Sequence, residues 1–365
     1  MATDTLAGNP VLELPETHQN NASRAYTSEP QRSLKRCLPV RIAGLGTYLP
    51  RDTVFSTELE KELGVSEGWI ERVTGVTERR RARGETTAGM AAAAVREALK
   101  DAGTELDEVD LFIGASTGRQ QSIPCNAVFL QKELMAKEGR SACFDVDATC
   151  LSFLFALRVA SLYLHTGQCR CIVVASSEVA SLSLNPLQPE SAALIGDAAV
   201  AAIVKASGSG ESSAIGHSSF STFSSGAHLT ELRGGGTFRH PNDPATAPED
   251  NMFSMDGPAV LKMALEAMPG FFETFLDQAG AAREDYDLII PHQASRRGLD
   301  FMRRALRLER GRIFSNLAHR GNCVAASIPL ALAESRNAGL LQRGKRVLLM
   351  GTGAGLTLGA MELIF

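Results

Sequence analysis

The chain has 365 residues, 44% of them hydrophobic, with 37 Lys or Arg against 41 Asp or Glu and a net charge of −4. These totals predict a globular protein with one large α/β domain or two packed halves. They argue against nucleic acid as the main partner, because phosphate binding needs a concentrated basic excess.

The start of the chain has no basic stretch followed by an apolar core, and no run reaches the roughly 20 apolar residues of a membrane span. Seven scattered cysteines are typical of reduced thiols, so we expect a cytoplasmic protein without a membrane span. Cys169 and Cys171 have no second Cys/His pair nearby and predict strand residues, not a zinc site.

Residues 1–38 are rich in Pro, Asn, Thr and Ser and predict a polar tail. From residue 39 to 210, β-rich runs alternate with helical ones, which predicts an α/β half with buried strands. Hydrophobic periodicity and glycine stops give the bounds. The expected helices are 86–103, 126–137 and 150–167, and the expected strands are 108–117, 142–148 and 170–179.

Residues 211–365 repeat this plan. They begin with a strand that passes into a Gly/Pro/Asn/Asp-rich segment up to about residue 256, expected to lie as a loop over the cleft. Helices are expected at 259–280, 298–308 and 325–339, strands at 287–295 and twice within 346–365, and a strand or loop at 312–322. The repetition predicts two halves related by a pseudo-twofold axis, with a site where corresponding helix ends meet.

Cys150 lies between a strand-like run and an apolar helix in "VDATCLSFLF". At the first turn of a helix, unpaired amides and the helix dipole favour the thiolate over the thiol. Taken alone, a free cysteine beside a strand is more often a packing residue. A catalytic role for Cys150 therefore depends on whether other reactive residues accompany it.

His292 follows an apolar strand and a proline in "DLIIPHQAS", and Asn322 begins a small-residue helix in "AHRGNCVAAS". Alone, the histidine is most simply a satisfied core or surface residue and the asparagine a helix N-cap. Together with Cys150 they place three reactive types at strand-to-helix junctions, two of them in corresponding places of the repeat. We interpret this set as a candidate catalytic triad.

The terminal "GTGAGLTLG" (351–359) is glycine-rich after a strand but is not a dinucleotide fingerprint, since G-x-G-x-x-G is not met and no helix follows. A turn of this kind is either a tight hairpin or a place where an amide points at a developing oxyanion.

The sequence resembles the thiolase-fold condensing enzymes, most closely the β-ketoacyl-acyl-carrier-protein synthase III group, from about residue 40 to the end. Seven ordered motifs carry the resemblance: "GWIERVTGVTERR" (68–80), "DVDATCLSF" (145–153), "IGDAAVAAIV" (195–204), "FSMDGPAV" (253–260), "IIPHQAS" (289–295), "GNCVAASIP" (321–329) and "GTGAGLTLG" (351–359). It implies a thiolase-like fold of two pseudo-twofold-related βαβαβ halves in α-β-α-β-α layers, with the cysteine in 39–210 and the histidine and asparagine in 211–365.

The resemblance implies that Cys150 is the acylated nucleophile, that His292 and Asn322 complete the triad, and that the amides of Cys150 and Ala354 form the oxyanion hole. The chemistry of these groups agrees. A thiolate accepts an acyl group from a thioester, and imidazole and carboxamide donors stabilise the enolate left when a malonyl-type carrier thioester loses carbon dioxide. The expected activity is a decarboxylative Claisen condensation in fatty-acid, polyketide or related metabolism, with no metal or redox cofactor.

Further substrate-binding residues follow from the same likeness. It assigns substrate contacts to Trp69, Leu151, Leu261 and Ser295. It also implies a homodimer in which Ile123 of the neighbouring subunit closes the acyl pocket, which suggests a medium or branched acyl group.

Several positions depart from the family pattern. Two arginines that hold coenzyme A fall on Val73 and Pro189, and an asparagine falls on Ser295. Their loss weakens the grip on a nucleotide by a few kcal/mol if nothing replaces it. An acyl-carrier protein is therefore as plausible a donor as acyl-CoA.

The run "SRRGLDFMRRALRLERGR" concentrates arginines in a mildly acidic chain. Such a run is usually a solvated helix face. Its place just after His292 favours docking of an acidic carrier protein on Arg297, Arg303 and Arg304.

Three alternatives stay open: a same-fold enzyme that makes an ester or amide, a condensation without decarboxylation, and a non-catalytic acyl-binding subunit. Asn322 argues mildly for condensation, and an intact triad argues against a silent subunit. A cysteine protease also uses Cys, His and Asn, but it gives no role to the terminal glycine-rich turn.

Overall fold

A computed structural model describes residues 37–365, which belong to one compact unit. Most of the predicted tail lies outside the described residues. Leu38, the last residue assigned to it, is buried and forms an isolated antiparallel bridge with Ile215.

The first sheet has the strand order β1-β7-β6-β4-β5. Its strands are β1 (Val40–Tyr48), β4 (Leu111–Gly114), β5 (Ala142–Asp145), β6 (Cys171–Glu178) and β7 (Ala198–Ala206). Helices α3 (Thr87–Ala102) and α4 (Asn126–Leu134) cover one face, and α5 (Ser152–His165) covers the other. A small subdomain contains β2 (Asp52–Phe55), α1 (Ser56–Leu63), α2 (Trp69–Thr74), β3 (Glu78–Arg81) and α6 (Pro189–Ala192).

The second sheet has the order β11-β12-β13-β8. Its strands are β8 (Ala214–Thr222), β11 (Leu288–Pro291), β12 (Arg346–Gly353) and β13 (Thr357–Ile364). Helices α7 (Gly257–Ala279) and α8 (Arg296–Ala305) lie outside it, and α10 (Ser327–Asn337) lies beside α5 between the sheets. The connections include β9 (Thr230–Glu231), β10 (Ser254–Met255) and α9 (Leu317–Arg320).

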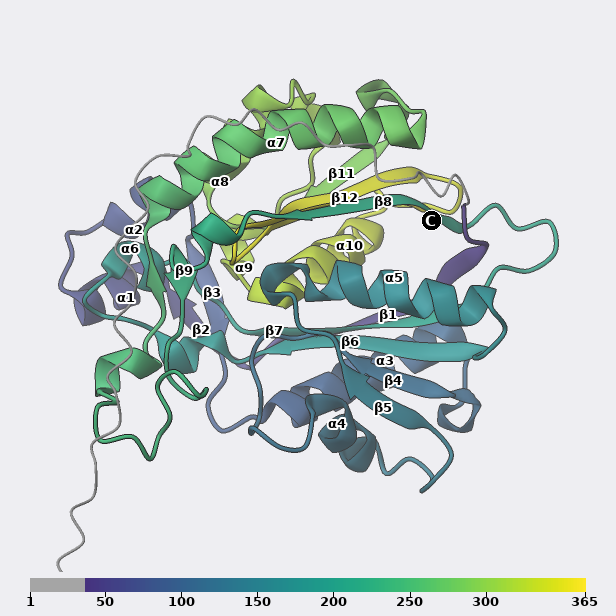
Figure 1. The fold of residues 1–365 in the computed structure, drawn as a ribbon, viewed down its shortest axis with the longest axis horizontal. Coiled ribbons are helices and arrows are strands. Elements are labelled where there is room, and N and C mark those ends of the chain that lie inside the picture. Colours follow the sequence, from purple (N-terminus) through teal and green to yellow (C-terminus); the bar gives the residue numbers. More distant parts are fainter. Residues whose placement is uncertain (1–36) are drawn as a thin grey trace, which may run out of the picture. The chain divides into compact units, whose positions relative to one another are not determined.

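Strand pairing repeats between the halves. β4 is parallel to β6, and β6-β7-β1 are antiparallel in turn. Likewise β11 is parallel to β12, and β12-β13-β8 are antiparallel in turn. Figure 1 shows the resulting α-β-α-β-α layers, with α5 and α10 in the middle. The predicted fold class is confirmed.

The central layer holds the two halves together through an apolar core. Leu154 and Leu157 of α5 and Ile328 and Leu332 of α10 are fully buried in one cluster with residues of both sheets. Because apolar burial contributes about 25 cal/mol per Å², this layer is a major source of stability shared by the two halves. Separate clusters lie between the first sheet and α3 and α4, and between the second sheet and α7.

Most predicted elements are present within a few residues of their expected bounds. The two halves differ in the region 312–322, which was expected to be a strand or loop. β5 pairs with β4 in the first half, whereas the second half keeps only an isolated parallel bridge between Ile289 and Ile313. The short helix α9 then follows, which the sequence did not predict. The helix expected at 150–167 also begins later, at Ser152, after the 3-10 helix η2 (Thr149–Leu151).

In residues 37–365, no helix combines the length and apolarity that crossing a membrane requires.

Candidate active site

Cys150 lies at the centre of η2, between β5 and α5. Thr149, just before it, has a φ of 51°, an uncommon conformation for a residue with a side chain. Asp147 Oδ1 accepts a hydrogen bond from Thr149 N at 3.0 Å, and Ser152 Oγ donates to Thr149 O at 2.7 Å. The turn that presents the cysteine is therefore fixed by side chains on both sides.

The protonation of Cys150 differs from the sequence expectation. Burial raises the pKa of its thiol to about 12, and the charge of Glu178 acts in the same direction. Since Cys150 precedes α5 on a separate turn, burial and a neighbouring carboxylate outweigh any help from the helix end. The expected preference for the thiolate is wrong for the free protein.

His292 follows β11 directly, and its amide donates to Met350 O of β12 at 2.8 Å. The residue is 6% exposed, and within the described residues its Nδ1 has no hydrogen-bond partner. Burial lowers the pKa of His292 to about 4. The imidazole is therefore neutral at physiological pH.

Asn322 belongs to a segment of the second half that pairs with the first half. Its backbone forms a parallel bridge with Ile195, in which Asn322 N donates to Leu194 O at 2.7 Å and Gly196 N donates to Asn322 O at 3.1 Å. Its side-chain Oδ1 accepts from Val324 N at 2.9 Å. With the oxygen engaged, the Nδ2 amide hydrogens are left for a ligand.

Two glycines permit this pairing. A Cβ at Gly196 would lie 2.1 Å from Arg320 O, and a Cβ at Gly321 would lie 2.5 Å from Leu194 O. Gly321 also has a φ of 66°. The motif "IGDAAVAAIV" thus requires a glycine at this position because the segment that carries Asn322 passes too close for a side chain.

Strand β12 brings the histidine and the cysteine turn together. A Cβ at Gly351 would lie 2.6 Å from His292 Cβ and 3.5 Å from Leu151 Cδ2. A Cβ at Gly353 would lie 2.6 Å from Thr149 Oγ1. The glycine-rich turn that contains Ala354 therefore begins against the Cys150 turn.

The Asn322 segment reaches the same place through the 3-10 helix η8 (Val324–Ala326), which contacts η2 directly. The structure thus gathers the turn of Cys150, the position of His292 and the turn next to Asn322 at one junction between the halves.

Glu178 belongs to this junction as well, although none of the sequence motifs points to it. It is the last residue of β6, 1% exposed, and its charge raises the pKa of Cys150. The available signal was an acidic residue closing the apolar run "CIVVASSE", an unusual position for a carboxylate.

The remaining predicted substrate residues are dispersed. Leu151 is buried beside Gly351, whereas Trp69 opens α2 and Leu261 lies in α7, both half-buried. Ile123 is 81% exposed. Ser295 caps α8, since its Oγ accepts from Gly298 N at 3.1 Å, so this hydroxyl has a structural task that the sequence comparison did not anticipate.

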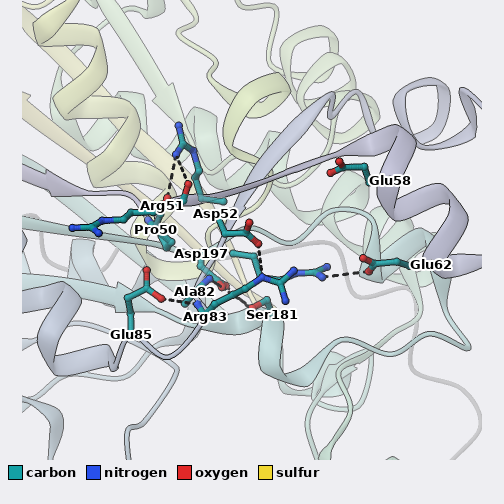
Figure 2. A network of polar contacts seen from close by, with 12 residues as sticks. Pro50, Arg51, Asp52, Glu58, Glu62, Ala82, Arg83, Glu85, Ser181 and Asp197 are labelled. Atoms are coloured by element: carbon teal, nitrogen blue, oxygen red, sulfur yellow. Dashed lines mark hydrogen bonds and ion pairs between the residues drawn. The ribbon is translucent and has the colours of Figure 1, made fainter.

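A polar network joins the small subdomain to the residue that precedes β7 (Figure 2). Asp197 Oδ2 accepts from Ala82 N at 2.8 Å and from Ser181 Oγ at 2.6 Å, and Arg83 Nε pairs with Asp52 Oδ2 at 2.6 Å. The network borders a surface cleft of about 530 Å³. None of the predicted site residues lines this cleft.

Two halves of this topology, joined where a cysteine turn meets a histidine and an asparagine, define a thiolase-fold acyltransferase. Models of 3-oxoacyl-[acyl-carrier-protein (ACP)] synthase III and of its C-terminal part match residues 144–224 and 276–364. The chain belongs to the β-ketoacyl-[acyl-carrier-protein] synthase III family of condensing enzymes, as predicted.

Relatives align over nearly the whole described chain. It is 33% identical over 324 residues to beta-ketoacyl-[acyl-carrier-protein] synthase III of Clostridium acetobutylicum, covering 89% of this chain and 98% of that protein. It is 35% identical over 326 residues to beta-ketoacyl-[acyl-carrier-protein] synthase III 3 of Streptomyces coelicolor, covering 88% and 96%.

Solved structures agree. The 3-oxoacyl-[acyl-carrier-protein] synthase III from Aquifex aeolicus VF5 superposes with a TM-score of 0.80 at 32% identity, covering 89% of this chain and all of the other. OleA from Xanthomonas campestris superposes with a TM-score of 0.81 at 22% identity, covering 92% and 99%, which shows a shared fold alone.

Proposed function

We propose that Cys150 takes an acyl group from a thioester and that the acyl-enzyme condenses with a malonyl-type carrier-protein thioester. The observation that carries this proposal is the meeting of three segments at one junction: η2 with Cys150, the end of β11 with His292, and η8 next to Asn322.

In the loading step, Cys150 Sγ attacks the thioester carbonyl and its proton ends on the sulfur of the departing carrier thiol. The tetrahedral oxyanion rests on the amides of Cys150 and Ala354. The exchange of one thioester for another is nearly isoenergetic, so the acyl group stays reactive. The packing of Gly353 on Thr149 supports this role for the last turn.

In the condensation step, the malonyl carboxylate leaves as carbon dioxide and its electron pair forms an enolate. His292 Nε2–H and Asn322 Nδ2–H donate to the enolate oxygen. The carbon attacks the acyl-Cys150 carbonyl, the C–S bond breaks, and the released thiolate takes up one proton. A neutral His292 suits this role, because the pKa of its imidazole is lowered to about 4 by burial.

The donor is an acyl-CoA or an acyl-carrier protein, and the chemistry calls for no resident metal or redox cofactor. Positions 73 and 189 carry Val and Pro, and the Ser295 hydroxyl already caps α8. Delivery of the acyl group on a carrier protein therefore fits this site at least as well as delivery on coenzyme A.

Helix α8 is the proposed docking surface for the acidic carrier. Arg297 and Arg304 are exposed and Arg303 is half-buried. None of the three takes part in an ion pair with residues 37–365. Unpaired cations on an exposed helix increase the rate of association with an oppositely charged partner.

A homodimer completes the proposal. Ile123 is 81% exposed, which is unusual for a large apolar side chain, and β5 forms an edge of the first sheet. Both features suit burial against a second copy of the chain, with Ile123 reaching the neighbour's acyl pocket and favouring a medium or branched acyl group.

Intact-mass analysis tests the reaction. The protein is incubated with panels of acyl-CoA and acyl-carrier protein, and malonyl-carrier protein is then added. A mass gain that Cys150→Ala abolishes, followed by its loss with formation of a β-ketoacyl product, is expected. Loading without a carbon–carbon product would indicate simple acyl transfer, and no mass gain with any thioester would contradict the proposal.

A further inference from the structure

Glu178 is a buried carboxylate held by backbone amides and not by a cation. Its Oε1 accepts from Thr117 N at 2.8 Å and its Oε2 accepts from Gly118 N at 2.9 Å. In the described chain it has no ion-pair partner. A carboxylate buried in this way is costly, and groups of this kind concentrate at functional sites.

The surroundings of Glu178 belong to both halves. Burial raises the pKa of Glu178 to about 7 and outweighs the amides of Thr117 and Gly118, which lower it; the charge of Asp147 raises it further, and the amide of Ala325 in η8 lowers it slightly. Its charge in turn raises the pKa values of Cys150 and Cys323. These three titratable groups, Asp147, Cys150 and Cys323, face it from the segments around it.

The segment that contains Thr117 and Gly118, the two donors to Glu178, is a second part of these surroundings. It leaves β4 and leads toward Ile123, while Ala325 belongs to the turn that follows Asn322. The carboxylate therefore joins the end of β6 to the segment after β4, and β6 also contacts η8. A shift of any of these by about 1 Å is enough to disturb a condensing geometry.

We propose that Glu178 is a positioning residue of the condensing site, which fixes the segment after β4 to the end of β6, where η8 packs. A carboxylate at this place disfavours a second negative charge on Cys150. The inference rests on the proposed role of Cys150 as the acylated nucleophile. In the free protein the cysteine then remains a thiol that resists alkylation at neutral pH, and it loses its proton only as the thioester reacts.

Two variants distinguish the effect of the charge of Glu178 from the effect of its side-chain length. Glu178→Gln keeps the size of the side chain and removes the charge, whereas Glu178→Asp keeps the charge and withdraws it from Thr117 and Gly118 by one methylene. Glu362→Gln is the matched control, because Glu362 is also buried, at 4% exposure, but binds Arg346 and Tyr286.

The alkylation rate of Cys150 by iodoacetamide is measured by peptide mass spectrometry between about pH 6 and pH 11. With Glu178→Gln, the pKa of the thiol falls and the alkylation rate at a given pH, such as pH 8, rises about tenfold for each unit of the fall. Glu362→Gln has the alkylation rates of the wild type across this range. Glu178→Asp keeps alkylation rates near the wild-type values, keeps acyl loading, and lowers condensation by about tenfold or more.

A folded Glu178→Gln protein that titrates like the wild type would overturn the role of the charge. Wild-type condensation by Glu178→Asp would overturn the positioning role, and this variant decides the matter if the glutamine variant does not fold. A wild-type protein that no thioester acylates would contradict the proposed function, while the alkylation titration would still test Glu178.

Discussion

Asp147 and Asn322 occupy equivalent positions of the two halves. Asp147 Oδ1 accepts a hydrogen bond from Thr149 N at 3.0 Å, and Asn322 Oδ1 accepts one from Val324 N at 2.9 Å. Thr149 and Val324 have φ values of 51° and 49°, and each begins a 3-10 helix that precedes α5 or α10. The equivalent of Cys150 in the second half is therefore Ala325, and Asn322 lies three residues before it. The expectation that Cys150 and Asn322 occupy corresponding places of the repeat is thus wrong by three residues.

This relationship predicts the effect of Asn322→Asp. The carboxylate can still accept from Val324 N, so the turn is kept, but the Nδ2 donor is lost. We expect acyl loading within about twofold of the wild type and condensation reduced about 100-fold or more. Loading is followed by intact mass and the β-ketoacyl product by chromatography. Equal losses in both steps would argue against a donor role for Asn322.

Gly196→Ala should displace the Asn322 segment. The added Cβ would lie 2.1 Å from Arg320 O, a backbone atom that cannot rotate away. We expect a loss of about 2–4 kcal/mol in the free energy of unfolding and a larger loss of condensation than of loading. The control is Gly208→Ala, where the nearest atom lies 3.7 Å from the added Cβ. Urea unfolding that does not distinguish the two variants would show this account of the motif to be incorrect.

His292 should make stability depend on pH on the acid side. The pKa of its imidazole is lowered from 6.5 to about 4 by burial, so between these values the unfolded chain binds more protons. The associated stability is fully present above about pH 6.5 and is lost as the pH falls toward 4, by at most about 3 kcal/mol. In His292→Gln, the difference in unfolding free energy between pH 7 and pH 5 should therefore shrink. An unchanged difference would mean that His292 titrates normally.

Charge reversal on α8 should weaken carrier use without affecting loading from acyl-CoA. With Arg297→Glu and Arg304→Glu combined, we expect KM for malonyl-carrier protein to rise about tenfold or more, with a weaker salt dependence. The control is Arg170→Glu, because Arg170 is 84% exposed in its side chain and lies just before β6, a strand of the first sheet, whereas α8 covers the second sheet. Steady-state kinetics at two salt concentrations measure the effect, and an unchanged KM would remove α8 from the docking surface.

Ile123→Glu should dissociate the proposed dimer, because a charge would replace an apolar side chain at the interface. Light scattering coupled to size exclusion measures the mass. Leu340→Glu, at a residue 54% exposed in the loop before β12, should leave the mass unchanged. A monomeric wild-type protein would contradict the dimer directly.

The two-fold repeat and most helices follow from local sequence, since period, caps and glycine stops are local signals. Gly103 and Gly167, for example, are the last residues of the helices predicted at 86–103 and 150–167. Both have positive φ values, 56° and 72°. The sequence left 312–322 open between a strand and a loop, because strand pairing depends on a distant partner. Only the folded chain shows that this segment forms an isolated bridge to Ile289 and then a short helix.

The family, the layered fold and the candidates Cys150, His292 and Asn322 can all be predicted from the sequence, because motifs and periodicity are local features of the chain. The pKa of the Cys150 thiol, raised to about 12, requires the folded protein, since burial and the charge of Glu178 both come from distant segments. Likewise, only the folded chain shows why Gly196 is needed, because the atom it avoids belongs to Arg320 in the other half.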